Sequence, residues 1–195
     1  MKKIAVFVSG SGSDMQSVID ATESGFVDAK VVCVVSSKLG AYALERAAKH
    51  GIPARVFALS QYGKDAAARD RAVIEWLDGF KPDLVVLAGY LGIVTKELVA
   101  KYRGRMINIH PSLIPLHCGK GMYGLHVHED VLKSGDKVSG ATVHFVDEGT
   151  DTGEIIVQQR VRVEEGDTPE TLQARILKVE HKLLPYAVKF LCEQD

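Results

Sequence analysis

The chain has 195 residues, of which 46% are hydrophobic and 25% charged, and its formal net charge is −1 at pH 7. This length suits one sizeable α/β domain and is too short for two comfortable ones. The near-neutral charge excludes a bulk basic surface of the kind that attracts nucleic acid, and the sequence has no polybasic run suited to a membrane surface.

The start of the chain resembles a signal peptide only briefly. The apolar run Ile4–Val8 ends at Ser9, well short of the about 7–15 residues of a signal-peptide core. No apolar run approaches the roughly 20 residues of a transmembrane helix. The three cysteines are widely spaced and odd in number, which argues against a disulfide framework. We therefore expect a cytoplasmic protein.

Apolar runs alternate with amphipathic stretches through the first 110 residues. A continuous apolar run, such as the one after Asp83, is typical of a strand covered on both faces. The alternation indicates a doubly wound α/β fold with a mostly parallel sheet and helices on both faces. The pattern predicts strands at Lys3–Val8, Lys30–Val35, Ala54–Phe57, Asp83–Ala88 and Arg105–Asn108, and helices at Ser13–Ser24, Ala41–His50, Asp65–Gly79 and Val94–Tyr102.

The second part of the chain has a different pattern. A Gly-rich loop at Cys118–Gly124 precedes a predicted helix at Val127–Lys133 and two longer strands at Gly140–Val146 and Glu154–Val163. A last helix should begin at Asp167-Thr168-Pro169-Glu170, an N-cap signal with Pro early and Glu in the first turn, and Pro185 should bend it. We interpret residues 1–195 as a single domain made of the parts 1–110 and 111–195. The predicted buried stripe of the last helix is Leu172, Ile176, Val179, Leu183, Ala187 and Leu191.

The loop Ser9–Asp14 lies between the first predicted strand and the first predicted helix. Glycines let a backbone approach a ligand, and the free N–H groups of a helix N-terminus attract anions. The loop is therefore a candidate phosphate site. A dinucleotide-binding loop would carry a third glycine where Met15 stands, so a phosphate monoester is favoured. The alternative is an ordinary tight turn with Ser13 as helix cap.

Asn108 and His110 stand two residues apart at the end of a predicted strand, so their side chains share one face. Two such donors suit a carbonyl oxygen that becomes an oxyanion. Asp151, in the polar loop between the two later strands, is a candidate partner that would raise the pKa of His110. His144 is a candidate support for this group. The alternatives are a polar strand end and an Asx-turn at Asp151.

His110, His126 and His128 also allow a metal site. The sequence lacks a His-Glu-x-x-His pattern, and the latter two residues precede or open a predicted helix. We therefore expect no metal.

Taken together, these motifs resemble the phosphoribosylglycinamide formyltransferase family, which uses formyltetrahydrofolate. The resemblance extends over nearly the whole chain and implies a Rossmann-like formyltransferase fold. It rests on Ser9–Asp14, Leu87–Leu91, the Asn-x-His-Pro-Ser-Leu-x-Pro string at Asn108–Pro115, Gly140–Val146 and Asp151-x-Gly153.

The resemblance implies transfer of a formyl group from 10-formyltetrahydrofolate, as co-substrate, to the amine of glycinamide ribonucleotide in purine biosynthesis. Asn108 and His110 would stabilise a tetrahedral intermediate, and His110 would also donate a proton. Asp151 would keep His110 protonated. The other implied contacts are Gly12, Ser13, Asp14 and Glu180 with the ribotide, and Lys64, Leu91, Gly92, Ile93, Val94, Asn108, Asp147 and Glu148 with the folate.

In this interpretation, 1–110 is the phosphate-binding half, and 111–195 holds the folate loop, the long strands and the last helix. The chain departs from the family at Asp14, where members often carry Asn, and at Gly92, where they often carry Arg. The loop Cys118–Gly124 is longer than in many members and is either a lid or a longer surface turn.

Other functions remain open. A formyltetrahydrofolate deformylase would use water as acceptor, and its family carries an added N-terminal domain. A methionyl-tRNA formyltransferase would need a C-terminal RNA-binding domain and a basic surface. A non-catalytic sugar-phosphate-binding protein would need only the loop at Gly12–Asp14. We expect a monomer or homodimer that acts on small-molecule substrates, with no nucleic-acid or membrane partner.

Overall fold

The computed structural model describes residues 1–194. Its helices and strands follow the order expected from the sequence, with one additional short 3₁₀ helix, η1 (Leu59–Tyr62). The strands are β1 (Lys2–Val8), β2 (Ala29–Ser36), β3 (Ala54–Val56), β4 (Leu84–Leu87), β5 (Met106–His110), β6 (Val138–Phe145) and β7 (Ile155–Arg162). The helices are α1 (Ser13–Glu23), α2 (Tyr42–Lys49), α3 (Ala66–Asp78), α4 (Lys96–Lys101), α5 (Leu125–Ser134) and α6 (Pro169–Cys192).

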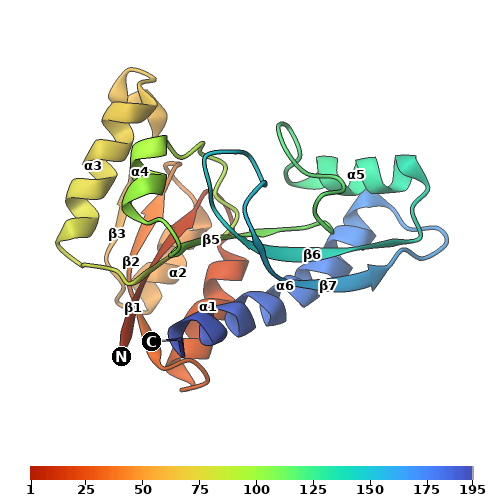
Figure 1. Cartoon of the computed structure of the whole chain (residues 1–195), viewed down its shortest axis with the longest axis horizontal. Helices are drawn as coiled ribbons and strands as arrows, with labels where there is room; N and C mark the ends of the chain where they lie inside the picture. Colours follow the sequence, from red (N-terminus) through yellow and green to blue (C-terminus); the bar gives the residue numbers. More distant parts are fainter. Residues whose placement is uncertain (195) are drawn as a thin grey trace.

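The strands form a single sheet of seven in the order β3-β2-β1-β4-β5-β6-β7. β1 to β5 pair in parallel, whereas β6 and β7 are antiparallel additions beside β5. Helices pack on both faces of the sheet (Figure 1). This arrangement confirms the predicted doubly wound, mostly parallel fold.

Each face of the sheet has its own apolar core. Side chains of β1 alternate between the two cores: Ile4 and Val6 pack with α1, α2 and α6, while Ala5 and Phe7 pack with α3 and α4. Because both faces are covered, every position of the strand from Ile4 onward is buried, which explains its continuous apolar run.

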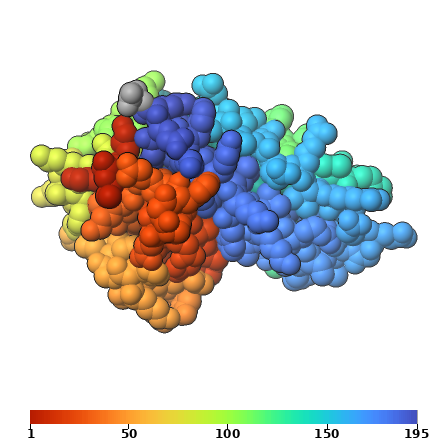
Figure 2. Space-filling model, turned by 90° about the horizontal axis from the view of Figure 1, so that it is seen from below, coloured from red at the N-terminus to blue at the C-terminus, as the bar shows by residue number. Residues whose placement is uncertain are grey.

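The helix α6 spans both parts of the chain. It packs against α1 in the first part and against β6 and β7 in the second, and Figure 2 shows its surface beside that of the first residues. Thr168 caps it by accepting a hydrogen bond from the backbone N–H of Thr171, as the sequence predicts. Pro185 lies inside the helix without ending it. None of the helices in residues 1–194 is long and apolar enough to cross a bilayer.

Two element ends differ from the expected ones in a way that shapes the site. β5 continues to His110, so Asn108 and His110 are both held in the sheet, opposite His144 and Thr142 of β6. α4 begins only at Lys96, and the backbone N–H of its N-cap residue, Thr95, donates to the carboxylate of Asp70 at 2.7 Å. The residues before Thr95 are left in a loop at the edge of the sheet.

Candidate active site

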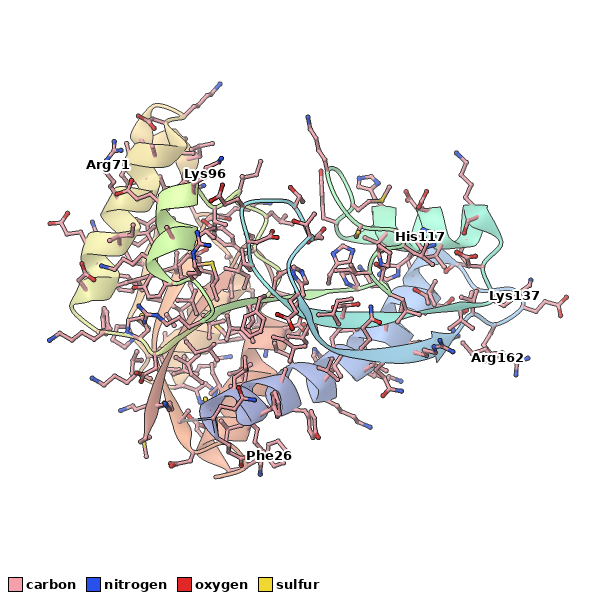
Figure 3. All side chains as sticks on the ribbon, viewed as in Figure 1. Phe26, Arg71, Lys96, His117, Lys137 and Arg162 are labelled. Carbon is pink, nitrogen blue, oxygen red and sulfur yellow. The ribbon has the colours of Figure 1, made fainter. Side chains whose placement is uncertain are left out.

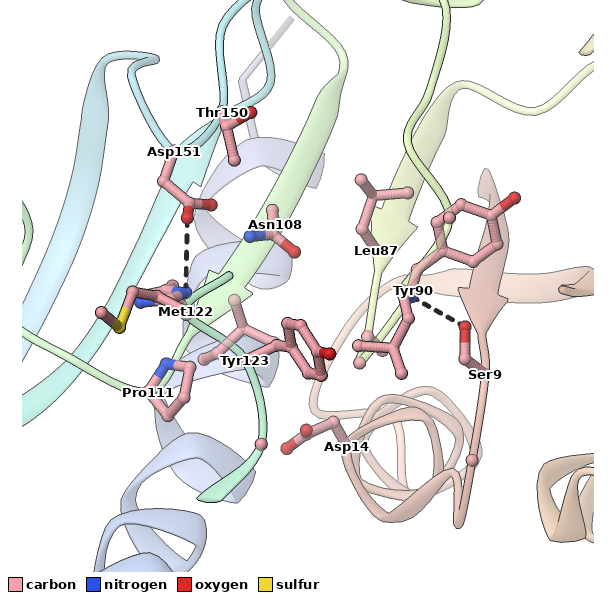
Figure 4. Close-up of a pocket in the computed structure, with 18 of the residues that line it drawn as sticks. Ser9, Asp14, Leu87, Tyr90, Asn108, Pro111, Met122, Tyr123, Thr150 and Asp151 are labelled. Carbon is pink, nitrogen blue, oxygen red and sulfur yellow. Dashed lines mark hydrogen bonds and ion pairs between the residues drawn. The ribbon is translucent and has the colours of Figure 1, made fainter. Parts of the chain in front are cut away.

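A cavity of about 700 Å³ opens beyond the carboxyl ends of β1, β4 and β5, where open α/β sheets bind ligands (Figure 4). Loops after these strands, the loop between β6 and β7, and α6 form its walls. Of the residues proposed from the sequence, it brings together Gly12, Ser13, Asp14, Leu91, Gly92, Ile93, Val94, Asn108, His110, His144, Asp147, Glu148, Asp151 and Glu180.

Lys64 lies outside this lining, in the turn between η1 and α3. Its contact with a folate tail stays a prediction.

The backbone at the start of α1 is open toward the cavity. Gly12, not Ser13, is the N-cap residue, and no side chain caps the helix, so the alternative of a cap by Ser13 is wrong. Gly12 has a positive φ of 71°, and a Cβ there would lie 2.6 Å from the Cβ of Ala43, so both conformation and space require glycine. The first-turn N–H groups of α1 are therefore free of side-chain caps and can bind an anion.

The half-buried carboxyl group of Asp14 and the buried carboxyl group of Glu180 lie at this end of the cavity. Glu180 is only 6% exposed, and Oδ1 of Asp14 has no hydrogen-bond partner among residues 1–194. Burial raises the pKa of Asp14 to about 7. Burial and the charge of Asp14 together raise the pKa of Glu180 well above its usual value. The pair therefore retains protons near neutral pH and can donate a hydrogen bond.

Asn108, His110 and Asp151 meet at the opposite side of the cavity. The loop between β6 and β7 returns over the end of β5 and places the Asp151 carboxylate 3.7 Å from Nδ1 of His110. The same carboxylate lies 3.6 Å from Nε2 of His144, which in turn lies 3.1 Å from Nδ2 of Asn108. His144 also bonds the carbonyl of Phe145 through Nδ1, at 2.8 Å.

His110 differs from the expectation in its charge. Its pKa is lowered, because burial of the 4% exposed ring disfavours the imidazolium more than the nearby Asp151 charge favours it. The expected raised pKa is therefore wrong. Nε2 of His110 donates to the carbonyl of His117 at 2.9 Å, so the neutral ring carries its lone pair on Nδ1, on the side of Asp151.

Asp151 itself is ionised. Burial alone would raise its pKa, but the nearby His144 and His110 side chains and a hydrogen bond from the backbone N–H of Gly119 lower it. The Gly119 bond is 2.9 Å long. The loop that precedes α5 thus contacts both His110 and Asp151.

The loop Leu91–Val94 is held by a buried ion pair that the sequence did not reveal. Nε of Arg69 donates to Asp70 at 2.7 Å, and another guanidinium nitrogen donates to the carbonyl of Ile93. The side chains of this pair are 3% and 0% exposed. The backbone N–H of Leu91 also donates to Oγ of Ser9 at 2.7 Å (Figure 4). A charged pair on an otherwise apolar helix stripe is the only sequence signal for this anchor.

Replacing Asp70 by alanine should lower the free energy of unfolding by about 3–5 kcal/mol, because the guanidinium of Arg69 would stay buried without its partner. Urea denaturation measures this loss. Asp78, whose exposed side chain pairs with Lys101, is the matched control, and its alanine variant should lose at most about 1 kcal/mol. Equal losses in both variants would contradict the anchoring role.

His128 lines the cavity and is almost fully buried. Burial, followed by the proximity of His110, lowers its pKa to about 4, so the ring is neutral. His126 instead is exposed and contacts Glu129 at 3.2 Å. Within residues 1–194, no group of three or more histidine, cysteine, aspartate or glutamate side chains is arranged to hold a metal ion.

Residues 2–188 match the family model described as formyl transferase. The chain is 42% identical over 193 residues to a chloroplastic phosphoribosylglycinamide formyltransferase of Arabidopsis thaliana, covering 99% of this chain and 66% of that protein. The chain thus spans a little less than two thirds of the length of this plant relative.

A phosphoribosylglycinamide formyltransferase of Haemophilus influenzae is 38% identical over 193 residues, which cover 99% of this chain and 88% of that protein. A crystal structure of glycinamide ribonucleotide transformylase 1 from Symbiobacterium toebii matches with a TM-score of 0.93 and 40% identity, covering 99% of this chain and 88% of that one. Since the similarity extends over nearly the whole chain and most of a bacterial relative, the chain belongs to the phosphoribosylglycinamide formyltransferase family of formyl-transferring enzymes.

Proposed function

We propose that this chain transfers the formyl group of 10-formyltetrahydrofolate to the amine of glycinamide ribonucleotide, a step of purine biosynthesis. The observation that carries the proposal is the meeting of Asn108, His110 and Asp151 in one cavity with the free backbone N–H groups of α1. A protein that only binds a sugar phosphate needs the free backbone N–H groups of α1. It does not need Asn108, His110 and Asp151 in the same cavity.

The ribotide phosphate would bind the N–H groups at Gly12, Ser13 and Asp14, where the helix dipole favours negative charge. Glu180 lines the same end of the cavity and would contact the ribotide beside its phosphate. The amine then points toward His110 at the far side. Binding energy from the remote phosphate would in this way orient the reacting amine.

The folate would lie along Leu91–Val94 and the loop between β6 and β7. Leu91 and Ile93 are 48% and 81% exposed at the cavity wall, which gives an aromatic ring an apolar surface. Asp147 and Glu148 line the facing loop. Asn108 lies between both substrates and would contact the formyl oxygen.

His110 acts as the proton carrier in the proposed reaction. Its neutral Nδ1 accepts the proton of the attacking amine as the new C–N bond forms. The resulting imidazolium faces the Asp151 carboxylate, whose charge stabilises it. His110 then gives this proton to the departing folate nitrogen as the formyl C–N bond of the folate breaks. Asp151 thus stabilises a transient charge, rather than keeping the resting histidine protonated.

Asn108 stabilises the oxyanion of the tetrahedral intermediate in this scheme. His144 donates to the carbonyl of Phe145 through Nδ1, so in the neutral ring Nε2 accepts one N–H of Asn108. The other N–H of the amide stays available for the oxyanion. Once protonated, His110 supplies a second donor through Nδ1.

Replacing Asp151 by asparagine should lower kcat and move the acidic limb of the pH–rate profile to lower pH. Neutral His110 is the active form, so activity falls as pH falls through its pKa, which already lies below 6.5. The Asp151 charge raises this pKa, and its removal lowers the pKa further. A pH series of kcat checks the shift. Glu154→Gln, an exposed charge near the same loop, is the control, and an unshifted limb in Asp151→Asn would remove Asp151 from this role.

An assay with 10-formyltetrahydrofolate, with and without glycinamide ribonucleotide, tests the proposed reaction. Formation of tetrahydrofolate only when the ribotide is present supports formyl transfer. Equal turnover without ribotide would identify a deformylase instead. Binding of the ribotide without any turnover would identify a non-catalytic binding protein.

We further propose that the protein acts in the cytoplasm, as a monomer or homodimer without nucleic-acid or membrane partners. The proposed steps use side chains of this chain and its two small-molecule substrates. Light scattering at working concentration tests the oligomeric state.

A further inference from the structure

His117 lies in the loop between β5 and α5 and is held at both ring nitrogens. Nδ1 is 2.6 Å from the Asp130 carboxylate of α5, and Nε2 is 2.7 Å from the Asp136 carboxylate that follows this helix. The side chain of His117 is 10% exposed. Figure 3 shows His117 beside α5.

This arrangement requires a charged ring. A neutral imidazole has one N–H donor, whereas two carboxylates accept hydrogen bonds from His117, so both nitrogens carry protons. Burial opposes this charge, but the hydrogen bonds to Asp130 and Asp136 outweigh it and raise the pKa of His117. We refer to His117, Asp130 and Asp136 as the histidine clamp.

The clamp holds a backbone conformation that a histidine rarely adopts. His117 has a φ of 51°, in the left-handed region that disfavours residues with a Cβ. The same residue thus combines an unfavourable backbone conformation with a side chain that is held at both ring nitrogens. The carbonyl oxygen accepts the Nε2–H of His110 at 2.9 Å, and two residues later the Gly119 N–H donates to Asp151.

We propose that His117 is a positioning residue whose clamped imidazolium aims its own carbonyl at His110 and so selects the His110 tautomer that leaves Nδ1 free for proton transfer. The inference deepens the proposed function, because it rests on His110 as the proton carrier. In this proposal, residues 117–119 at the start of the Gly-rich loop hold the side chains of His110 and Asp151 in place.

The groups around the clamp determine its dependence on pH. Asp130 and Asp136 face the ring from α5 and the turn after it. His110 meets the carbonyl from β5, and Asp151 meets the adjoining loop from between β6 and β7. When pH rises through the pKa of His117, the ring keeps one N–H and loses one carboxylate contact. The orientation of its carbonyl should loosen at that point.

Nitrogen-15 NMR of the histidine rings tests the clamp in the unaltered protein. At neutral pH, His110 should show a protonated Nε2 and an unprotonated Nδ1, and His117 should show two protonated nitrogens. The His110 signals should then change together with the deprotonation of His117. Constant His110 signals through that titration would overturn the proposal. The measurement needs no substrate, so it can succeed even if the formyl-transfer assay fails.

The double variant Asp130→Asn/Asp136→Asn tests the effect on catalysis. It removes both charges with little change of shape, so kcat should fall about 10-fold or more, since a catalytic group misplaced by ~1 Å can cost ~100-fold. The KM for the ribotide should stay within about twofold, because its phosphate binds at the distant α1 N-terminus. The ring of His110 should also populate both neutral tautomers instead of one.

Glu129→Gln is the matched control, because this α5 carboxylate is exposed and contacts only His126 among the ion pairs within residues 1–194. Its kcat and its His110 spectrum should equal those of the unaltered protein. A folded double variant with unchanged kcat and an unchanged His110 spectrum would overturn the proposal. If the double variant does not fold, the titration of the unaltered protein decides.

Discussion

Replacing His110 by alanine should lower kcat by about 10²–10⁴-fold, the usual contribution of a positioned general acid–base group. The affinity for the ribotide should change little, because the proposed phosphate contacts lie at the start of α1 on the other side of the cavity. Steady-state kinetics gives the first quantity, and calorimetric titration with the ribotide gives the second.

His126→Ala provides the control for this experiment. His126 is an exposed histidine of α5, bonded to Glu129 and outside the lining of the cavity. Its removal should leave both kcat and ribotide binding unchanged. If His110→Ala instead weakened ribotide binding as much as it slowed turnover, His110 would be a binding residue and the proposed proton transfer would be wrong.

Replacing Asp14 by asparagine should abolish a strong dependence of ribotide binding on pH. Burial raises the pKa of Asp14 to about 7, so the carboxyl is neutral in weakly acidic solution and ionised above pH 7. An ionised Asp14 would repel the phosphate dianion that we propose to bind at the adjacent backbone N–H groups. The KM for the ribotide should therefore rise above pH 7, by at most about tenfold for each pH unit, the limiting slope for one linked proton.

The Asn variant keeps the shape of the side chain and loses this ionisation. Its ribotide KM should stay nearly flat between pH 7 and pH 9, whereas kcat should equal that of the unaltered protein. Asp20→Asn, an exposed position on the same helix, should retain the full pH dependence. A pH slope in Asp14→Asn equal to that of the unaltered protein would show that another group controls binding.

The same ionisation affects the stability of the fold. The folded protein keeps the Asp14 proton up to about pH 7, whereas the unfolded chain releases it near the usual value of 3.8. The folded state therefore binds more protons between these values, and its stability decreases as pH rises through that window. Asp14→Asn should accordingly raise the melting temperature at pH 8 by more than at pH 5.

Local patterns were sufficient for most of the fold. The alternation of buried strands with amphipathic helices over 1–110 predicted the parallel sheet, because strands covered on both faces must be apolar at every position. The expected N-cap at Thr168 was also found, because capping depends on residues that are close in the sequence. The hydrogen bond that Thr95, before α4, makes with Asp70 could not be predicted, because Asp70 lies 25 residues earlier in the chain.

The candidate site was likewise predicted in part from local spacing, whereas contacts between distant segments could not be predicted. The positions of Asn108 and His110 on one face of β5 follow from the two-residue period of a strand. The buried pair Arg69–Asp70 and the clamp at His117 were missed, because their contacts join separate elements of the chain, which short-range spacing does not predict. Asp14 was recognised as a departure from the family, but its raised pKa required burial that only the folded chain provides.

By itself, the sequence determined the order of the elements, the loop that can bind an anion, and the residue types that can polarise a carbonyl, because these depend on short-range spacing. Only the tertiary structure decided which of these groups carry charge. His110 is neutral, His117 is charged and Asp14 can hold a proton, because burial and the nearest carboxylates or carbonyls come from distant segments of the chain. The charge of a buried group follows from its surroundings, and those exist only once the chain has folded.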